Sequence, residues 1–142
     1  MALNFDGVTG SVSHGDITQM NGAAVLSWSF WLWVNVYLSQ DALVCKGVGI
    51  GIVEGEATEV ANSLALYMPT AASRTYSPAN ELVAGEWAHW GVIYNGGGAT
   101  LPDKVKILKN GLNRTVSTLG VTPATFPAIG GTNLTVATDG AF

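Results

Sequence analysis

The sequence predicts an all-β domain, built as a sandwich or a barrel. Helix patterns are nearly absent, because eighteen glycines and runs of β-branched residues interrupt every i, i+3, i+4 apolar spacing. The stretch Leu26–Leu38 alternates its side chains so regularly that it predicts a long β-strand. Other short segments of strand-forming residues recur between turn residues. No repeat, linker or low-complexity tract divides the chain, so we expect a single domain over residues 1–142.

Residues of high strand propensity, bounded by glycine, proline and asparagine, define the predicted strands. All five prolines fall outside them, where a missing N–H costs no ladder hydrogen bond. In chain order the predicted strands are Ala2–Phe5, Ser11–Ser13, Val25–Leu38, Ala42–Lys46, Ile50–Val53, Ser63–Met68, Trp87–Tyr94, Lys104–Lys109, Thr115–Leu119 and Leu134–Ala137.

The longest strand has two different faces. One face is apolar and predicts a core contact. The other mixes aromatic rings with small polar groups, which suits a second buried layer, a sugar-binding groove or a protein interface. The apolar face holds Leu26, Trp28, Phe30, Leu32, Val34, Val36 and Leu38, and the mixed face holds Ser27, Ser29, Trp31, Trp33, Asn35 and Tyr37.

Two further local patterns predict contacts. Asn110-Gly111 predicts a hairpin between Lys104–Lys109 and Thr115–Leu119, because both turn residues tolerate positive φ. Alternation within Trp87–Tyr94 places His89 on the face of Trp87 and Gly91, opposite Ala88, Trp90 and Val92. A lone strand histidine of this kind predicts a structural role.

Composition excludes several classes of function. Charged residues make up 11% of the chain and the net charge is −4, so we expect no nucleic-acid partner, which would require a basic stripe. No apolar run reaches the length of a transmembrane helix, so we expect no membrane partner. The single cysteine, Cys45, excludes an intrachain disulfide and cysteine-rich zinc sites, and we expect it to be a small buried hydrophobe.

The first residues carry no secretion signal, since strand-like Ala2–Phe5 follows Met1 with neither a basic nor an apolar leader. We expect a protein made in the cytoplasm that reaches a virion or an extracellular surface by assembly into a particle or by lysis of the host. The alternative, that the sequence is a trimmed piece of a secreted protein, stays open.

The order of motifs resembles the laminin-G-like group of concanavalin A-like lectin and glucanase domains. The most telling part is Trp87-Ala88-His89-Trp90 followed by the Asn110-Gly111 hairpin. The resemblance covers nearly the whole chain. It rests on Ala2-Leu3-Asn4-Phe5-Asp6-Gly7-Val8, Ser29-Phe30-Trp31-Leu32-Trp33-Val34, Leu43-Val44-Cys45-Lys46-Gly47, Gly85 to Gly96, Val105 to Gly111, and Ala128-Ile129-Gly130-Gly131.

This resemblance implies a two-sheet antiparallel jelly-roll sandwich with Leu26–Leu38 as a central strand. Members of the family continue into a final strand that is missing before Phe142, and its loss would leave an open sheet edge able to pair with another chain. The alternative, that the protein continues past Phe142, stays open.

Glycosidases of this fold carry a Glu-x-Asp-x-x-Glu strand, and the nearest match is Glu54, Glu56 and Glu59. Retaining hydrolysis needs two carboxyl groups about 5 to 5.5 Å apart. Glutamate replaces the family's aspartate, no sugar-gripping aromatic flanks the motif, and the segment reads as a loop. We therefore expect no enzyme, and glycoside hydrolysis stays a distant alternative.

Calcium is the ion this fold often binds at its loops. Several aspartates occur in loop contexts, but none forms a dense cluster, and a role as turn residues is the favoured explanation for them. We therefore predict no cofactor, keep calcium as an open alternative and assign no calcium ligands. The aspartates concerned are Asp6, Asp16, Asp41, Asp103 and Asp139.

Aromatic side chains are the positive signal for function. We expect at least three of the five tryptophans to be packing residues. The first hypothesis is a non-catalytic module that presents a binding surface, as a structural or decorating component of a particle such as a phage virion, with protein neighbours and a glycan as a further partner. The alternative is a secreted carbohydrate-binding or adhesion domain of a larger protein. The candidates for the exposed patch are Trp31, Trp33, Tyr37, Tyr67 and Tyr76.

Overall fold

The computed structural model describes residues 11–35, 42–46, 50–54, 60–68, 73–128 and 130–138. Within these ranges the protein is mostly β, which confirms the all-β prediction. Besides strands it contains one turn of 3-10 helix, η1 (Thr18–Met20), and one four-residue helix, α1 (Leu101–Lys104). The predicted strand Ala2–Phe5 lies outside the described residues.

Seven antiparallel strands form the larger sheet. Its β6 is absent from the predicted strands, because the sequence Ser-Arg-Thr-Tyr has no apolar alternation to mark it. In spatial order the strands are β1 (Val12–Ser13), β11 (Leu134–Thr138), β3 (Ala42–Lys46), β4 (Ile50–Glu54), β5 (Leu64–Met68), β6 (Ser73–Tyr76) and β10 (Ser117–Leu119).

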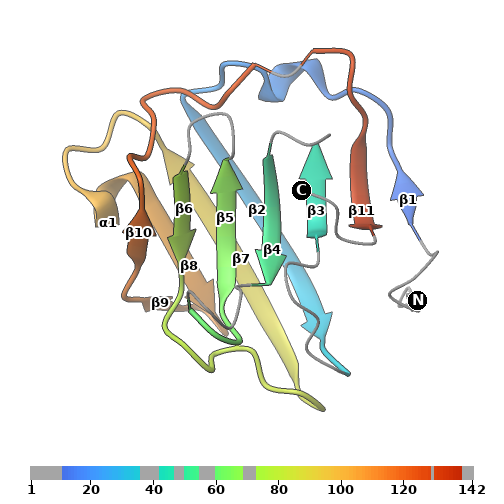
Figure 1. The fold of residues 1–142 in the computed structure, drawn as a ribbon, viewed down its shortest axis with the longest axis vertical. Helices are drawn as coiled ribbons and strands as arrows, with labels where there is room; N and C mark the ends of the chain where they lie inside the picture. The colour runs from blue at the N-terminus through green and yellow to red at the C-terminus, as the bar shows by residue number, and fades with distance from the viewer. Residues whose placement is uncertain are drawn as a thin grey trace.

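Four antiparallel strands form the smaller sheet, in the order β2 (Val25–Trp33), β7 (Trp87–Asn95), β8 (Val105–Lys109) and β9 (Leu112–Arg114). Figure 1 shows the two sheets as layers, with β2 and β7 running diagonally behind β4 and β5. The longest strand is expected to be central, but among the described strands it is not. There β2 has one neighbour, β7, and forms an edge of the smaller sheet.

The two sheets pack face to face around one core. Leu64 and Leu66 of β5 are fully buried against Trp90 and Val92 of β7 and Ile107 of β8. The apolar face predicted for β2 is confirmed as far as it is described: Leu26, Trp28, Phe30, Leu32 and Val34 pack against this core.

The Asn110-Gly111 turn forms as predicted, with φ values of 51° and 79°. Its second strand is nevertheless β9, not the predicted Thr115–Leu119. A two-residue turn pairs the residues directly after it, so Leu112 lies opposite Lys109. The chain then crosses to the larger sheet, where Ser117–Leu119 pairs with β6.

A buried lysine joins the turn around η1 to the larger sheet. Lys46 is 1% exposed, and its Nζ lies 2.7 Å from Asp16 Oδ1 and donates to Asn21 Oδ1, also at 2.7 Å. The Gly131 N–H donates to the same Asp16 carboxylate at 3.0 Å. The hydrogen bonds from Lys46 and Gly131 hold the pKa of Asp16 below its ordinary value.

The segment 123–126 closes one end of the sandwich over Gly96. The Tyr94 hydroxyl donates to the Pro123 carbonyl at 2.9 Å, and the Phe126 N–H donates to the Ala23 carbonyl at 2.8 Å. A Cβ at Gly96 would lie 1.8 Å from the Ala124 carbonyl oxygen. Only glycine allows this close approach.

We expect Gly96→Ala to lower the free energy of unfolding by about 1–3 kcal/mol, because the methyl group overlaps backbone atoms. Gly97→Ala is the matched control, since its Cβ would meet only Asn95 Oδ1, at 3.6 Å. That variant should stay within about 0.5 kcal/mol of the wild type. Urea unfolding followed by tryptophan fluorescence measures both values, and equal stability of the two variants would contradict the close approach.

The Asp16 contacts predict a specific pH dependence. A carboxyl group whose pKa is lowered by folding contributes stability that is present above its unfolded pKa of about 3.9 and is lost as the pH falls through the folded pKa. Asp16→Asn removes this contribution. Between about pH 5 and pH 2, the free energy of unfolding should therefore fall more steeply for the wild type than for Asp16→Asn. Parallel pH profiles in urea titrations would rule out the effect.

Candidate functional site

The outer face of the smaller sheet exposes three tryptophans. Trp31 is 65% exposed, Trp33 41% and Trp87 50%, although all three lie within regular strands. Large aromatic rings are normally packed against other groups, so their gathering on one face makes it a candidate binding surface. We call Trp31, Trp33, Trp87 and His89 the tryptophan face.

The register of β2 and β7 brings these four residues together. Trp31 lies directly opposite His89, and Trp33 directly opposite Trp87. The ring centroids are 5.3 Å apart in the first pair and 5.8 Å in the second, with tilted planes in both. Cross-strand aromatic pairs of this kind hold one another in place while leaving ring surface open.

Polar groups border the rings. Ser29 Oγ and His89 Nε2 share a hydrogen bond of 2.8 Å, and Trp33 Nε1 donates to Asn35 Oδ1 at 2.7 Å. Gly91, the next outward residue of β7 after His89, has no side chain, and the Leu108 side chain of β8 lies beside it, with Cδ1 3.5 Å from the position that a Cβ would take. The face therefore offers aromatic surface, hydroxyl, imidazole and amide groups side by side.

The outward side chains of β2 and β7 include no carboxylate, lysine or arginine. They are Val25, Ser27, Ser29, Trp31 and Trp33 on β2, and Trp87, His89, Gly91, Ile93 and Asn95 on β7. The face therefore suits an uncharged ligand, because a charged one would lose hydration without gaining a counter-charge.

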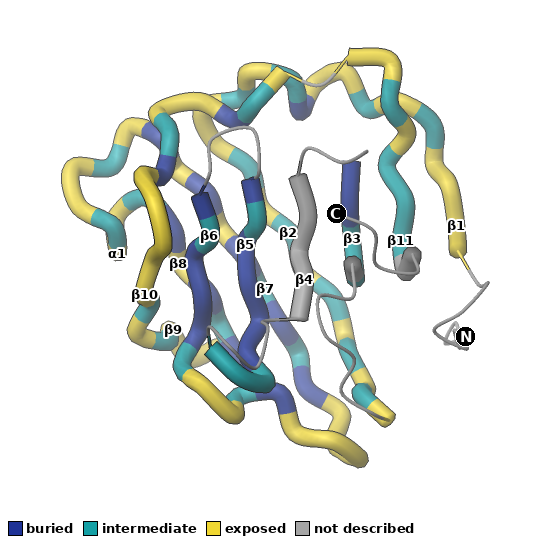
Figure 2. The backbone as a smooth tube through the Cα atoms, viewed as in Figure 1, coloured by how far each residue is buried: buried dark blue, intermediate teal, exposed yellow. Residues whose placement is uncertain are grey.

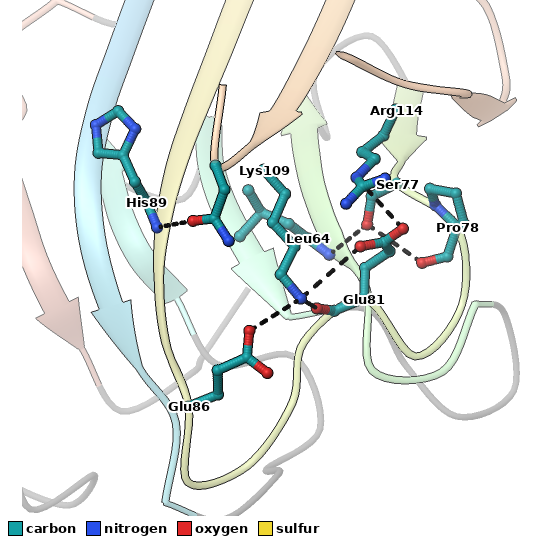
Figure 3. Close-up of polar contacts among 9 residues, drawn as sticks. Leu64, Ser77, Pro78, Glu81, Glu86, His89, Lys109 and Arg114 are labelled. Carbon is teal, nitrogen blue, oxygen red and sulfur yellow. Dashed lines mark hydrogen bonds and ion pairs between the residues drawn. The ribbon is translucent and has the colours of Figure 1, made fainter. Parts of the chain in front are cut away.

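The segment before β7 is anchored by a second buried lysine, as Figure 3 shows. Lys109 Nζ donates to the Glu81 carbonyl at 2.7 Å and lies 3.7 Å from Glu86 Oε1. Arg114 Nε lies 3.4 Å from Glu81 Oε1. These contacts fix residues 81–86 against β8 and β9, and so position Trp87 at the start of β7.

A small hollow beside this anchor is lined by Leu32, Val34, Leu82 and Trp90 together with Lys109. Its acidic lining groups, Glu81 and Glu86, already face the Lys109 ammonium group, as described above. The hollow is therefore explained as part of the anchor of the 81–86 segment.

Ser29 and His89 form the first two members of a Ser-His-Asp arrangement, but the third is missing. Within the described ranges no carboxylate contacts the remaining ring nitrogen of His89, Nδ1. Ser29 also lies in the middle of a regular strand, whereas the serine nucleophile of α/β-hydrolases occupies a sharp turn between a strand and a helix. The pair can hold a ligand hydroxyl.

The structure does not bring the five predicted candidates together. Trp31 and Trp33 share the tryptophan face. Tyr67 is half-buried on the opposite side of the molecule, on the outer face of the larger sheet, with the Arg74 guanidinium 4.1 Å above its ring. Tyr76 is 1% exposed, so its place in an exposed patch is wrong. Tyr37 lies outside the described residues.

The packing role expected for at least three tryptophans is also wrong. Trp90 is buried, and Trp28 packs on Phe126 with centroids 5.5 Å apart, while the other three are exposed. The predicted site residues do not include Trp87 and His89. Alternation placed them on one face of their strand, yet only the pairing with β2 shows that this face meets Trp31 and Trp33.

The predicted metal and catalytic candidates are partly described. Asp16 pairs with Lys46, and Asp103 accepts hydrogen bonds from the Thr100 hydroxyl and N–H at the start of α1, which lower its pKa. Among the described residues no three histidine, cysteine, aspartate or glutamate side chains gather. The structure does not describe the side chains of the remaining predicted candidates, which are Asp6, Asp41, Asp139, Glu54, Glu56 and Glu59.

No protein-family model and no curated protein sequence matches this chain. In the ranges that the structure describes, no helix has the length and apolar character needed to cross a bilayer. Cys45 is buried, as expected for a small hydrophobe.

Proposed function

We propose that the protein is a non-catalytic carbohydrate-binding module that uses the tryptophan face. The observation that carries this proposal is the presence of three exposed tryptophans, with bordering hydroxyl, imidazole and amide groups, on the outer face of β2 and β7, where these two strands carry no charged side chain. A pyranose ring presents C–H groups on its flat sides and hydroxyl groups around its rim. It therefore matches aromatic surface at the centre and polar groups beside it.

The shape of the site favours the flank of a polysaccharide chain over a single sugar. The exposed rings lie on two adjacent strands, with Trp31 and Trp33 about 7 Å apart along β2 and the β7 pair about 5 Å to the side. Such an open platform contacts several sugar units from one side, whereas a small ligand is usually enclosed by a pocket.

The two antiparallel sheets, packed face to face, support the jelly-roll sandwich that the laminin-G-like resemblance implies, and we propose that architecture here. Because this fold hosts binding modules and enzymes alike, the function rests on the site and not on the fold.

A second candidate function is a structural or decorating component of an assembled particle such as a virion, with protein neighbours. The observation that favours it is that no other described strand pairs with the outer edge of β2 in the smaller sheet, since an open edge is a template for another chain. Both functions place the protein at a virion or extracellular surface.

We expect Trp31→Ala and Trp33→Ala each to weaken glycan binding at least about tenfold, because each removes stacking surface worth more than about 1.4 kcal/mol. The control is Leu119→Ala, which shortens a side chain 51% exposed on the other sheet. An array of plant, algal and bacterial polysaccharides identifies the ligand, and affinity electrophoresis in gels containing it measures binding. All three variants should remain within about 0.5 kcal/mol of wild-type stability.

The carbohydrate proposal would be wrong if the wild type bound no polysaccharide on the array, or if both tryptophan variants bound as tightly as the wild type. Light scattering after size exclusion tests the second candidate function, because a protein that stays monomeric and does not assemble argues against a component of a particle.

A further inference from the structure

The outer edge of β2 presents a row of backbone hydrogen-bonding groups. The Gly96 N–H donates to the Ala24 carbonyl at 2.9 Å, so the even-numbered residues of this strand direct their N–H and C=O groups toward β7. The odd-numbered residues direct theirs the other way. No strand in the described part of the chain pairs with that edge. The residues concerned are Val25, Ser27, Ser29, Trp31 and Trp33.

Proteins normally protect such an edge with charged side chains, prolines, bulges or very short strands. This strand has none of these devices. It is nine residues long, contains no charged residue and no proline, and pairs with β7 over its whole length without a register shift. The edge is therefore competent to accept another strand.

The core is also less complete on this side of the sandwich. The inward side chains of β7, such as Trp90 and Val92, are 1% and 0% exposed. Their inward neighbours on β2, Trp28 and Phe30, are only half-buried, as is Leu134 on β11 of the other sheet. Figure 2 shows the same contrast, with β5 and β7 largely buried along their inward positions and β2 and β11 intermediate.

We propose that an extended segment of a partner protein adds to the edge of β2 as an antiparallel strand. Only a polypeptide strand can match a row of N–H and C=O groups at this spacing. The neutral edge selects a segment without charges over its central residues. The half-buried inward row selects apolar side chains at alternate positions, which would complete the core. This site uses the backbone groups of β2, whereas the tryptophan face uses side chains, so the proposal does not depend on carbohydrate binding.

A second copy of this chain fits the edge less well. Pairing β2 with its own copy brings together only nine residues from each molecule, whereas a stable interface takes roughly 20–30 residues a side. A single strand from a partner protein would instead place its inward side chains between the half-buried apolar side chains of both sheets and bury them. The small area of a contact between two β2 strands therefore favours a segment donated by a partner protein.

The probe is a fluorescein-labelled peptide of nine residues that alternates threonine and valine, flanked by lysines for solubility. Valine should face the core, opposite the even residues of β2, and threonine should face outward. In this arrangement the threonine N–H groups point at β2, and the valine N–H groups point away from it. N-methylation of the threonine amides should abolish binding in fluorescence anisotropy, whereas N-methylation of the valine amides should leave it within about twofold.

A protein variant tests the same edge from the other side. Ser27→Pro removes one edge-facing N–H without touching the ladder to β7, and Ser27→Ala keeps that N–H. We expect Ser27→Pro to weaken peptide binding at least about tenfold and Ser27→Ala to bind like the wild type. Circular dichroism checks the fold of both variants, and the methylated peptides decide the question on wild-type protein if Ser27→Pro fails to fold.

Three outcomes would overturn the proposal. The first is no binding of the unmethylated peptide at about 1 mM. The second is equal binding of the two methylated peptides. The third is a wild-type dimer in light scattering that Ser27→Pro converts to a monomer, since the edge would then belong to a second copy. A silent glycan array leaves this proposal standing, because the peptide assay does not measure carbohydrate binding.

Discussion

The antiparallel register between β2 and β7 controls what each sheet face presents. Nine consecutive residue pairs join the two strands, and side chains alternate between core and solvent with a period of two. A slip of one residue would turn Trp28 and Phe30 outward and Trp31 and Trp33 into the core. The hydrophobic pattern opposes this slip, and two backbone hydrogen bonds mark the ends of the ladder, Gly96 N–H to Ala24 O and Gly85 N–H to Val34 O.

Local patterns in the sequence were sufficient to predict the strands of this ladder and their inward faces. Periodicity identifies which residues share a face, and the Asn110-Gly111 turn identifies which strands are neighbours. Neither pattern shows which edge a strand occupies. The position of β2 at an edge depends on the order of four strands that span residues 25–114, and no local signal encodes that order.

The tryptophan face shows the same division between local and distant information. Trp31 and Trp33 were identified because they share a strand with polar neighbours. Trp87 and His89 lie more than fifty residues further along the chain, and their place beside Trp31 and Trp33 follows only from pairing. The prediction for Tyr76 is wrong for the converse reason. Its strand, β6, carries polar residues that suggest exposure to solvent, yet both faces of this strand are covered.

The two buried lysines are a further feature that periodicity does not reveal. Lys46 and Lys109 occupy buried strand positions where an apolar side chain is normal. Oxygen atoms from a distant segment of the chain stabilise each ammonium group. A buried ammonium group is tolerated only with such partners. Consequently each lysine fixes one loop: Lys46 holds the η1 turn at one end of the sandwich, and Lys109 holds residues 81–86 before Trp87.

One strand, β2, contributes to both proposed binding sites, and the geometry keeps them compatible. The odd-numbered residues point their side chains away from the sheet and their N–H and C=O groups within its plane. A glycan on the face and a strand at the edge therefore meet different groups of the same residues. An added strand would place its own outward side chains next to Trp31 and Trp33, about 5 Å away. Strand addition would therefore widen the platform on the side of β2 opposite Trp87 and His89, so that the partner chain itself would contribute to the choice of carbohydrate.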